Sequence, residues 1–183
     1  MHEMRYSGDS FLRLENMVEI AKRRGLDGIC ITDHDSMGLK EFAAEYSEKT
    51  EFPIFVGIEF YSLQGDIVAF GIEDYPKERI PAQEFVDLVQ AQGGMCFSAH
   101  PFRNNNRGLE ENLKIVKGLD GIEVLNGSTL YEANRKAAEY AAELGLATVG
   151  SSDCHVPEKL GIYATYFPRE IRSVQELIRS VKR

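Results

Sequence analysis

Four short apolar runs in this chain each end in side chains of the types that bind metal ions. The runs close with Thr32-Asp33-His34-Asp35, Gly57-Ile58-Glu59-Phe60, Ser98-Ala99-His100-Pro101 and Ser152-Asp153-Cys154-His155. The chain has only four histidines, and three of them lie in these segments, while the fourth is His2. If the ends of the runs converge in space, their imidazoles and carboxylates form a site for more than one metal ion. Such a site is typical of metal-dependent hydrolases.

Short apolar runs alternate with amphipathic segments, which predicts strands alternating with helices. We expect strands at 28–32, 53–58, 66–70, 95–98, 121–125, 146–150 and 163–167, and helices at 11–24, 37–48, 81–92, 109–117, 131–144 and after Ser173. No helix separates the run 66–70 from its predecessor, so an antiparallel or edge strand is expected there. Ser10 is the expected cap of the first helix, and Ser173-Val174-Gln175-Glu176 has the capping-box pattern that opens the last one.

The expected strands could close into a barrel or lie as an open, doubly wound sheet. Their apolar runs are continuous, which is typical of strands covered on both faces, and the strand–helix rhythm predicts parallel βαβ units. Polar residues lie at or just past the ends of most strands, and Glu123 lies inside one. A barrel gathers all of its strand ends at one mouth, whereas an open sheet gathers only those beside its switch point. The pattern therefore favours an α/β barrel.

Length and composition limit the class of protein. The 183 residues suit a single domain, taken here as 1–183. The formal net charge of −8 argues against a general nucleic-acid-binding surface. Three cysteines cannot all pair, and Cys30 and Cys96 lie in apolar runs, so free buried thiols and a reducing, cytoplasmic setting are expected. No stretch is long and apolar enough to span a bilayer, and no signal-peptide pattern opens the chain.

Five motifs in order resemble the polymerase and histidinol phosphatase (PHP) domain. They are Ile-Thr-Asp-His-Asp-Ser (31–36), Gly-Ile-Glu (57–59), Ala-His-Pro-Phe (99–102), Gly-Ile-Glu-Val-Leu-Asn-Gly (121–127) and Gly-Ser-Ser-Asp-Cys-His (150–155). One such motif would be weak evidence of a family, whereas five in order are a specific signal. The resemblance covers the chain from roughly Ser7 to Gly161. The resemblance implies a distorted (β/α)7 TIM-like barrel with two or three divalent metal ions (manganese, zinc or iron) at its mouth, and hydrolysis of phosphoesters.

The resemblance also implies a set of metal ligands, with Glu59 as the bridge between two ions. Asp9 matches the ligand that follows the family's first motif, and Glu123 or Asn126 lies where the family often offers another polar ligand. The full expected set is His2, Asp9, His34, Glu59, His100, Glu123, Asp153 and His155.

The chain departs from the family at its start. The family opens with a strand ending in Asp-x-His-x-His, whereas this chain begins Met1-His2-Glu3. If His2 is the second histidine of that motif, which is the preferred interpretation, the first falls before Met1. If His2 is the first histidine, Met4 replaces the second. Either way most of a first strand is missing, through a late start or a real loss of one metal position. An incomplete barrel exposes an edge, so lower stability or a homodimer through that edge is expected.

Residues beside the ligands have expected supporting roles. Asp33 and Asp35 are expected to cap the following helix or to orient His34, and Cys154 is expected to point away from the site. Pro101 is expected to hold His100 in an extended conformation.

The segment Arg103-Asn104-Asn105-Asn106-Arg107 follows a motif histidine directly. Because a guanidinium grips phosphate with two parallel hydrogen bonds, Arg103 and Arg107 are expected to bind the substrate phosphate, together with Asn126. An Asn-rich loop that serves only as a turn is the simpler alternative.

Metal-activated water attacking a small phosphorylated metabolite or nucleotide is the expected reaction, with His100, Asp153 and Glu59 as catalytic residues. Long nucleic acids and membranes are not expected as partners. A short-oligonucleotide exonuclease is one alternative. A degenerate barrel with a structural or binding role is another, motivated by the incomplete first motif.

Overall fold

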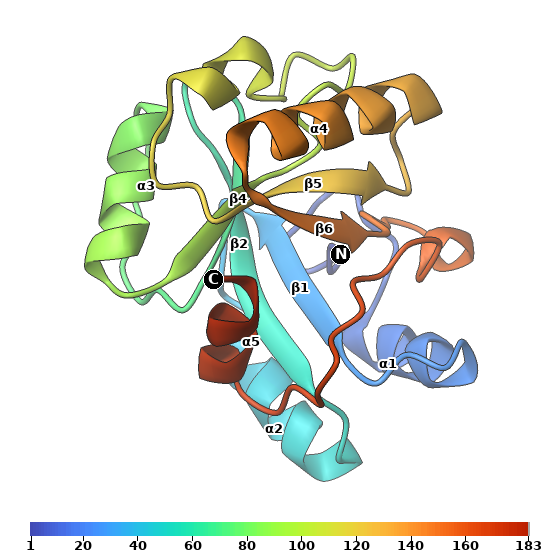
Figure 1. The fold of residues 1–183 in the computed structure, drawn as a ribbon. Coiled ribbons are helices and arrows are strands. Elements are labelled where there is room, and N and C mark those ends of the chain that lie inside the picture. Colours follow the sequence, from blue (N-terminus) through green and yellow to red (C-terminus); the bar gives the residue numbers. More distant parts are fainter. Residues whose placement is uncertain (183) are drawn as a thin grey trace.

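The computed structural model, which describes residues 1–182, is built around one curled sheet of six strands (Figure 1). The strands are β1 (Ile29–His34), β2 (Ile54–Tyr61), β3 (Asp66–Phe70), β4 (Met95–Ser98), β5 (Gly121–Asn126) and β6 (Ala147–Ser151). They lie side by side in chain order. β3 is antiparallel to both of its neighbours, as expected for the run without a preceding helix, and all the other pairs are parallel.

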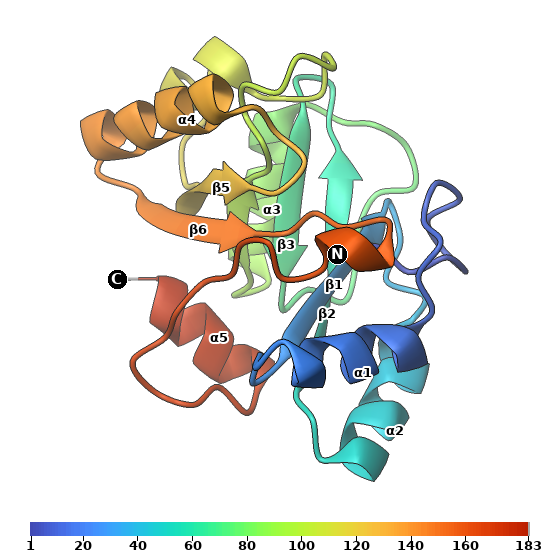
Figure 2. The ribbon, with the colours of Figure 1, turned by 90° about the vertical axis from the view of Figure 1, so that its right-hand side faces the viewer.

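Four helices cover the outer face of the curl, α1 (Leu14–Arg23), α2 (Lys40–Thr50), α3 (Ala82–Ala91) and α4 (Tyr131–Leu144) (Figures 1 and 2). The last helix, α5 (Val174–Val181), packs on the inner face, where Leu177 and Val181 join the cluster of Val68 and Phe70. Two short 3-10 turns complete the fold, η1 (Glu110–Lys114) and η2 (Pro157–Lys159). The apolar faces of these helices fix the sheet in place. On α3, for example, Phe85 is fully buried and stacks on Phe60 of β2, with 4.2 Å between the ring centroids.

Most of the predicted elements are confirmed, and three details are wrong. Helix α4 has the expected bounds, and the Ser173 side chain caps α5 by accepting the Glu176 N–H. Ser10 does not cap α1, because its hydroxyl donates to the His2 carbonyl instead. The expected helix 109–117 is only the single 3-10 segment η1.

The expected strand at 163–167 does not form. The Thr165 hydroxyl contacts the backbone N–H and carbonyl of Gly150, at 3.0 and 2.9 Å, in place of a strand ladder. From there the chain runs across the opening between β6 and β1 to reach α5 (Figures 1 and 2).

The closed seven-stranded barrel is not confirmed, because β6 and β1 do not pair within residues 1–182. Met1 and His2 are what lies between them. The Met1 carbonyl accepts the Thr32 N–H, and the His2 N–H donates to the Cys154 carbonyl. These two residues therefore connect β1 to the segment after β6 by backbone hydrogen bonds. The incomplete first strand stays a prediction.

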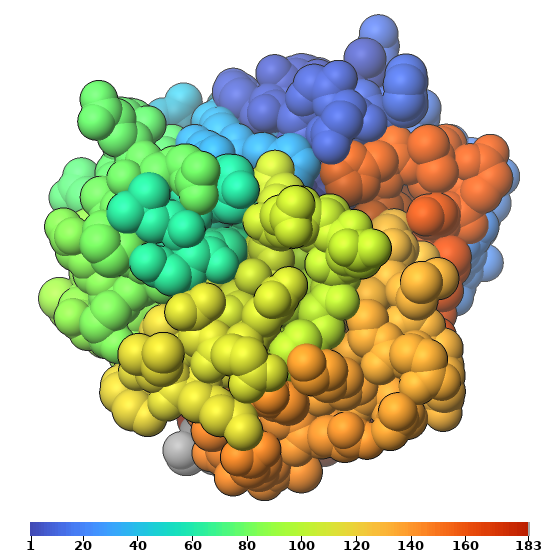
Figure 3. All heavy atoms as spheres, turned by 90° about the horizontal axis from the view of Figure 1, so that it is seen from above, coloured from blue at the N-terminus to red at the C-terminus, as the bar shows by residue number. Residues whose placement is uncertain are grey.

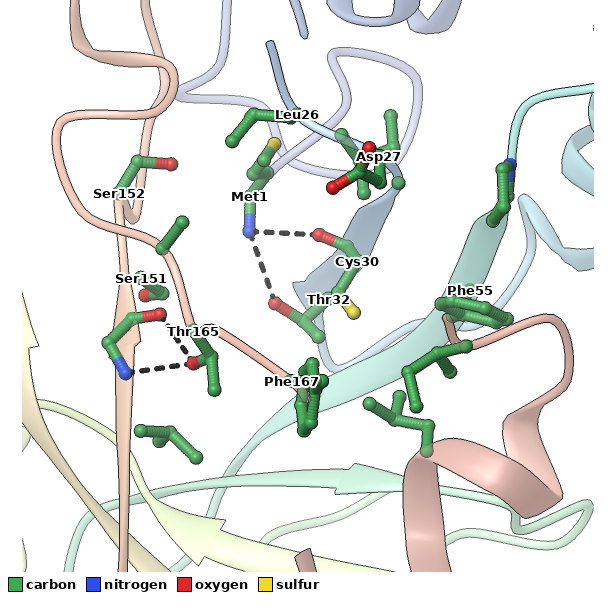
Figure 4. A pocket seen from close by; sticks show the side chains of 18 of the residues that line it. Met1, Leu26, Asp27, Cys30, Thr32, Phe55, Ser151, Ser152, Thr165 and Phe167 are labelled. Atoms are coloured by element: carbon green, nitrogen blue, oxygen red, sulfur yellow. Dashed lines mark hydrogen bonds between the residues drawn. The ribbon is translucent and has the colours of Figure 1, made fainter. Parts of the chain in front are cut away.

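A chamber of about 1070 Å³ fills the rest of the gap (Figure 4). Apolar side chains such as Phe55, Phe97 and Phe167 line it, and the Met1 ammonium group lies in it beside the Cys30 carbonyl and the Thr32 hydroxyl. The interior that a closed barrel fills with layers of side chains is only partly packed here. A homodimer through this open side stays a prediction.

Among residues 1–182, no helix combines the length and the apolar character that crossing a bilayer requires.

Gly57 in β2 lies where no larger side chain fits. A Cβ at this position would lie 2.3 Å from the Ala69 carbonyl oxygen. We expect Gly57→Ala to push β2 and β3 apart and to lower the free energy of unfolding by roughly 1–3 kcal/mol, measured by urea denaturation. Gly8→Ala is the control, because a Cβ there meets nothing within 4 Å. Equal stability of the two variants would contradict the close approach.

Candidate metal centre

The carboxyl ends of the parallel strands meet at one edge of the sheet, and the predicted ligands gather there. His34 ends β1 and is paired in register with Glu59 of β2. His100 and Asp153 follow the ends of β4 and β6 by two residues each. Figure 3 shows the N-terminal segment (blue) and the segments after β4 (yellow-green) and β6 (orange-red) meeting on one face.

Three imidazoles form the first group of ligands. Single nitrogen atoms of His2, His34 and His155 all lie within 4.8 Å of one another. The His2 ring stacks on both of the others, at centroid distances of 4.3 and 4.2 Å. The Asp9 carboxylate reaches in from a loop, with Oδ2 at 3.4 Å from His34 Nε2 and 3.3 Å from His155 Nε2. Three ring nitrogens and one carboxylate are a donor set that zinc, manganese and iron accept.

Glu59, Asp66 and His100 form the second group, again with one ligand atom each within 4.8 Å. All three are buried. His100 Nε2 lies 3.0 Å from Glu59 Oε1 and 3.6 Å from Asp66 Oδ2. His100 Nδ1 is buried without a hydrogen-bond partner. Two carboxylates and an imidazole again fit a divalent ion.

Glu59 connects the two groups. Its Oε2 lies 3.0 Å from His34 Nδ1 and 3.5 Å from His2 Nε2, while its Oε1 faces His100. His34 Nδ1 is buried and has no hydrogen bond of good geometry, so the two atoms converge without satisfying one another. One oxygen toward each group is the arrangement that a bridging carboxylate requires.

Asp153 stands at the side of the first group. Its Oδ1 lies 3.0 Å from His2 Nε2. Its Oδ2 accepts hydrogen bonds from Arg103 and from Asn126 Nδ2. Asp153 is therefore close enough to contribute to the site, and it also forms an ion pair with Arg103.

Glu123 lies one layer deeper, and its carboxylate oxygens already have partners. Oε2 accepts the His100 backbone N–H at 2.6 Å and Asn126 Nδ2 at 2.9 Å, and Oε1 accepts the Ser151 hydroxyl. These contacts position the His100 backbone and the Asn126 amide. A ligand role for Glu123 stays a prediction, and the geometry favours a positioning role.

The residues flanking the motif ligands act on the backbone. Asp33 accepts the Glu3 N–H and the Ser7 hydroxyl, so it holds the N-terminal loop rather than capping a helix. Asp35 accepts the Tyr61 N–H at 2.8 Å. Cys154 is fully buried.

His100 and Asp153 share an unusual backbone conformation. Their φ angles are +27° and +44°, in the left-handed region that non-glycine residues seldom adopt. The extended conformation expected for His100 before Pro101 is therefore wrong. Strain of this kind costs of order 1–3 kcal/mol per residue and persists where the surrounding structure enforces it, commonly at functional sites.

Burial and charge shift the pKa values of His2 and His100 in opposite directions. Burial lowers the pKa of His2 to about 4, although Asp153 and Glu59 oppose that change. Burial also acts to lower the pKa of His100, but the hydrogen bond and charge of Glu59 outweigh it and raise that pKa to about 9. His2 is thus a neutral imidazole near neutral pH, ready to donate a lone pair, whereas His100 must lose a proton before it can bind an ion.

Asp66 is the site residue that sequence reasoning missed. Burial raises its pKa to about 6 despite its ion pair with Arg107. It opens β3, and because that strand runs antiparallel, its first residue lies at the same edge as the last residues of the others. The expected antiparallel direction of 66–70 was the signal that could have placed Asp66 in the site.

Comparisons with known proteins agree with this arrangement. Residues 131–183 match the family model described as PHP-associated. Over 119 residues the chain is 27% identical to an uncharacterized protein of Methanocaldococcus jannaschii. The aligned region covers 64% of this chain and 68% of that protein.

Solved structures share the fold at low sequence identity. A candidate metal-dependent phosphoesterase from Bifidobacterium adolescentis superposes with a TM-score of 0.75 at 20% identity, over 90% of each chain. An amidohydrolase from Chromobacterium violaceum, solved with sulfate and no metal, gives 0.73 at 18% identity, over 98% of this chain and 95% of that one. The lesion-specific endonuclease Q of Pyrococcus furiosus gives 0.60 at 17% identity, over 88% of this chain and 49% of that one.

These likenesses bear on the fold and not on substrate. The match of residues 131–183 to the PHP-associated model agrees with the resemblance to the PHP domain that the five motifs carry.

Proposed function

We propose that the protein is a metal-dependent hydrolase of phosphoesters in small phosphorylated metabolites or nucleotides. One observation carries the proposal: Glu59 presents one carboxylate oxygen to the imidazoles of His2 and His34 and the other to His100. Two groups of ligands joined by a carboxylate suit a pair of divalent ions, and the histidines and acids present are of the types that manganese, zinc and iron bind.

Bound divalent ions would polarise a phosphoryl oxygen and make water a stronger nucleophile at neutral pH. The chain's own side chains supply the rest. Glu59 and Asp153 hold negative charge at the centre, and His100 offers its Nε2 to an ion once it has released the proton that Glu59 stabilises. Arg103, Arg107 and Asn126 border the same space and offer N–H donors to the phosphate of a substrate.

The charge of the chain supports a small substrate over long nucleic acids. A net charge of −8 repels the phosphodiester backbone of a nucleic acid at long range. If activity on short oligonucleotides exists, it should fall steeply with added salt, whereas turnover of a small monoester should change little.

Metal analysis and a substrate screen test the proposal together. We expect at least two ions per chain by mass spectrometry after reconstitution, and chelator-sensitive release of phosphate from a panel of monoesters and diesters. His155→Gln should lose roughly 10³-fold in kcat/KM, because it removes a ligand of the first group. Glu158→Gln, an exposed acid of the same segment, is the matched control. A metal-loaded protein without phosphoesterase activity on any substrate would overturn the proposal.

A further inference from the structure

A single loop brings two arginines to two carboxylates of the candidate metal centre. The loop, residues 101–108, follows β4 and carries Arg103 and Arg107 four positions apart. Arg103 pairs with Asp153, and Arg107 pairs with Asp66. Each guanidinium therefore neutralises an acid that a divalent ion would also bind.

Arg103 is held in place by several polar groups. Its Nη2 donates to Asp153 Oδ2 and, at 2.5 Å, to Asn126 Oδ1, and its Nε donates to the Thr129 hydroxyl at 2.9 Å. The side chain is only 20% exposed. A planar cation therefore sits beside the carboxylate oxygen that faces away from His2.

Arg107 makes the corresponding contact on the other side. Its Nε and Nη2 donate to the two carboxylate oxygens of Asp66 at 2.7 and 2.9 Å, a bidentate pair. Its guanidinium also lies over the ring of Tyr61, 4.4 Å from the centroid. Asp66 is buried, whereas the Arg107 side chain is 31% exposed, so the guanidinium reaches from the rim of the site to a buried acid.

The backbone of the loop is tightly fixed, so both arginines are delivered in a defined place. The Arg107 carbonyl accepts the Asp66 N–H at 2.6 Å, and the Pro101 carbonyl accepts the Glu110 N–H at 3.0 Å. A Cβ on Gly108 would lie 2.0 Å from the Pro101 oxygen, so only glycine permits this closure.

The charge of the centre explains why cations are needed there. Four buried carboxylates (Glu59, Asp66, Glu123 and Asp153) lie close together, and a buried carboxylate is costly unless it is paired or bound to an ion. Arg107 holds both oxygens of Asp66, so a divalent ion at Asp66 would share the charge and lone pairs that the guanidinium now uses. An ion at Asp153 would likewise share its carboxylate charge with Arg103, which bonds Oδ2 while Oδ1 faces His2.

We propose that Arg103 and Arg107 are internal cations that compete with divalent ions for Asp153 and Asp66, and so set the metal affinity of the centre. Without metal, the two ion pairs stabilise the acids. When an ion binds, the guanidiniums leave the carboxylates and remain at the rim of the site. This goes beyond the proposed function, because it requires metal binding but no hydrolysis.

The metal affinity of variants in which an uncharged side chain replaces each arginine tests the proposal. We expect Arg103→Gln and Arg107→Gln each to bind manganese or zinc about tenfold more tightly than the unmodified protein, by competition with a chromophoric chelator. The same variants should have a lower Tm in excess chelator, and this deficit should shrink at saturating metal. A merely structural role would lower the Tm equally in both conditions.

Arg79→Gln is the matched control. Arg79 lies 3.7 Å from the centroid of the same Tyr61 ring and bonds the Ser62 carbonyl, but it pairs with no carboxylate of the centre. Its loss changes the net charge equally, and it should leave metal affinity unchanged. Repeating the titrations at 0.5 M salt screens long-range charge effects, while direct competition persists.

Three outcomes overturn the proposal in distinguishable ways. Unchanged or weaker metal affinity in both variants refutes competition while leaving the proposed function intact. Equal tightening in Arg79→Gln replaces competition with a general charge effect. An unmodified protein that binds no divalent ion refutes the proposed function as well. If a glutamine variant does not fold, Arg103→Lys, which keeps the charge but loses the planar fork, should still bind metal more tightly.

Discussion

Replacing Glu59 with glutamine should remove the proposed phosphoesterase activity almost completely, with kcat/KM lowered by roughly 10³-fold or more. Glu59 is the only one of the predicted ligands whose carboxylate faces both ligand groups, at 3.0 Å from His34 Nδ1 and 3.0 Å from His100 Nε2. Glutamine keeps the shape but loses the charge and one acceptor oxygen. We therefore expect the variant to lose at least one bound ion, measured by mass spectrometry on the reconstituted protein.

Glu123→Gln is the informative comparison for this experiment. Glu123 is as deeply buried as Glu59 and also lies on a strand of the same sheet, but it contacts the His100 backbone and Asn126 rather than an imidazole. Substitution of a residue that positions metal ligands commonly lowers activity 10–100-fold. We therefore expect Glu123→Gln to lower kcat/KM by about that factor while the ions are retained. If Glu123→Gln lost metal and Glu59→Gln did not, the assignment of the bridge would be reversed.

The residues of the candidate site could be predicted because their signal is local. An apolar run followed directly by His, Asp or Glu specifies both a strand and a polar end. The order of five such runs resembles a family whose strand ends converge. The structure brings His2, His34, Glu59, His100, Asp153 and His155 together at one edge, as this reasoning implies.

The features that were missed depend on pairing between distant segments. Asp66 enters the site because β3 runs antiparallel, and although that direction was expected from the missing helix, Asp66 opens its strand rather than ending it and so lacked the pattern of the other candidate ligands. The expected strand 163–167 has the right composition, but the Thr165 side chain takes the Gly150 backbone groups that a ladder would use. Closure of the barrel likewise depends on pairing between β6 and β1, which the structure lacks within residues 1–182.

The two arginines show the same limit in another form. Their position beside a motif histidine predicted a phosphate role, and that stays a prediction. Their pairing with Asp153 and Asp66 joins residues 50 and 41 positions apart, and it follows from the path of one glycine-closed loop. Sequence reasoning identified the charges and could not assign their partners.

Metal affinity should rise with pH by up to tenfold per unit between pH 7 and about 9, and then level off. His100, whose pKa Glu59 raises to about 9, must release its proton before its Nε2 can bind an ion. Calorimetry in two buffers of different ionisation enthalpy at pH 7.5 should therefore detect about one proton released for each chain loaded. Absence of proton release would place the ion away from His100.

The pKa shifts of His100 and His2 also predict how the stability of the metal-free protein depends on pH. The folded pKa of His100 lies above the unfolded value, so its contribution, on the order of 3 kcal/mol, is fully present below about pH 6.5 and is lost as the pH rises through 9. The folded pKa of His2 lies below the unfolded value, so its contribution is present above about pH 6.5 and is lost as the pH falls through 4. Urea denaturation in chelator should therefore show greatest stability near pH 6–7. In Glu59→Gln the alkaline loss should disappear, because the neutral amide no longer holds the proton on His100. An alkaline loss of the same size in that variant would mean that another group titrates.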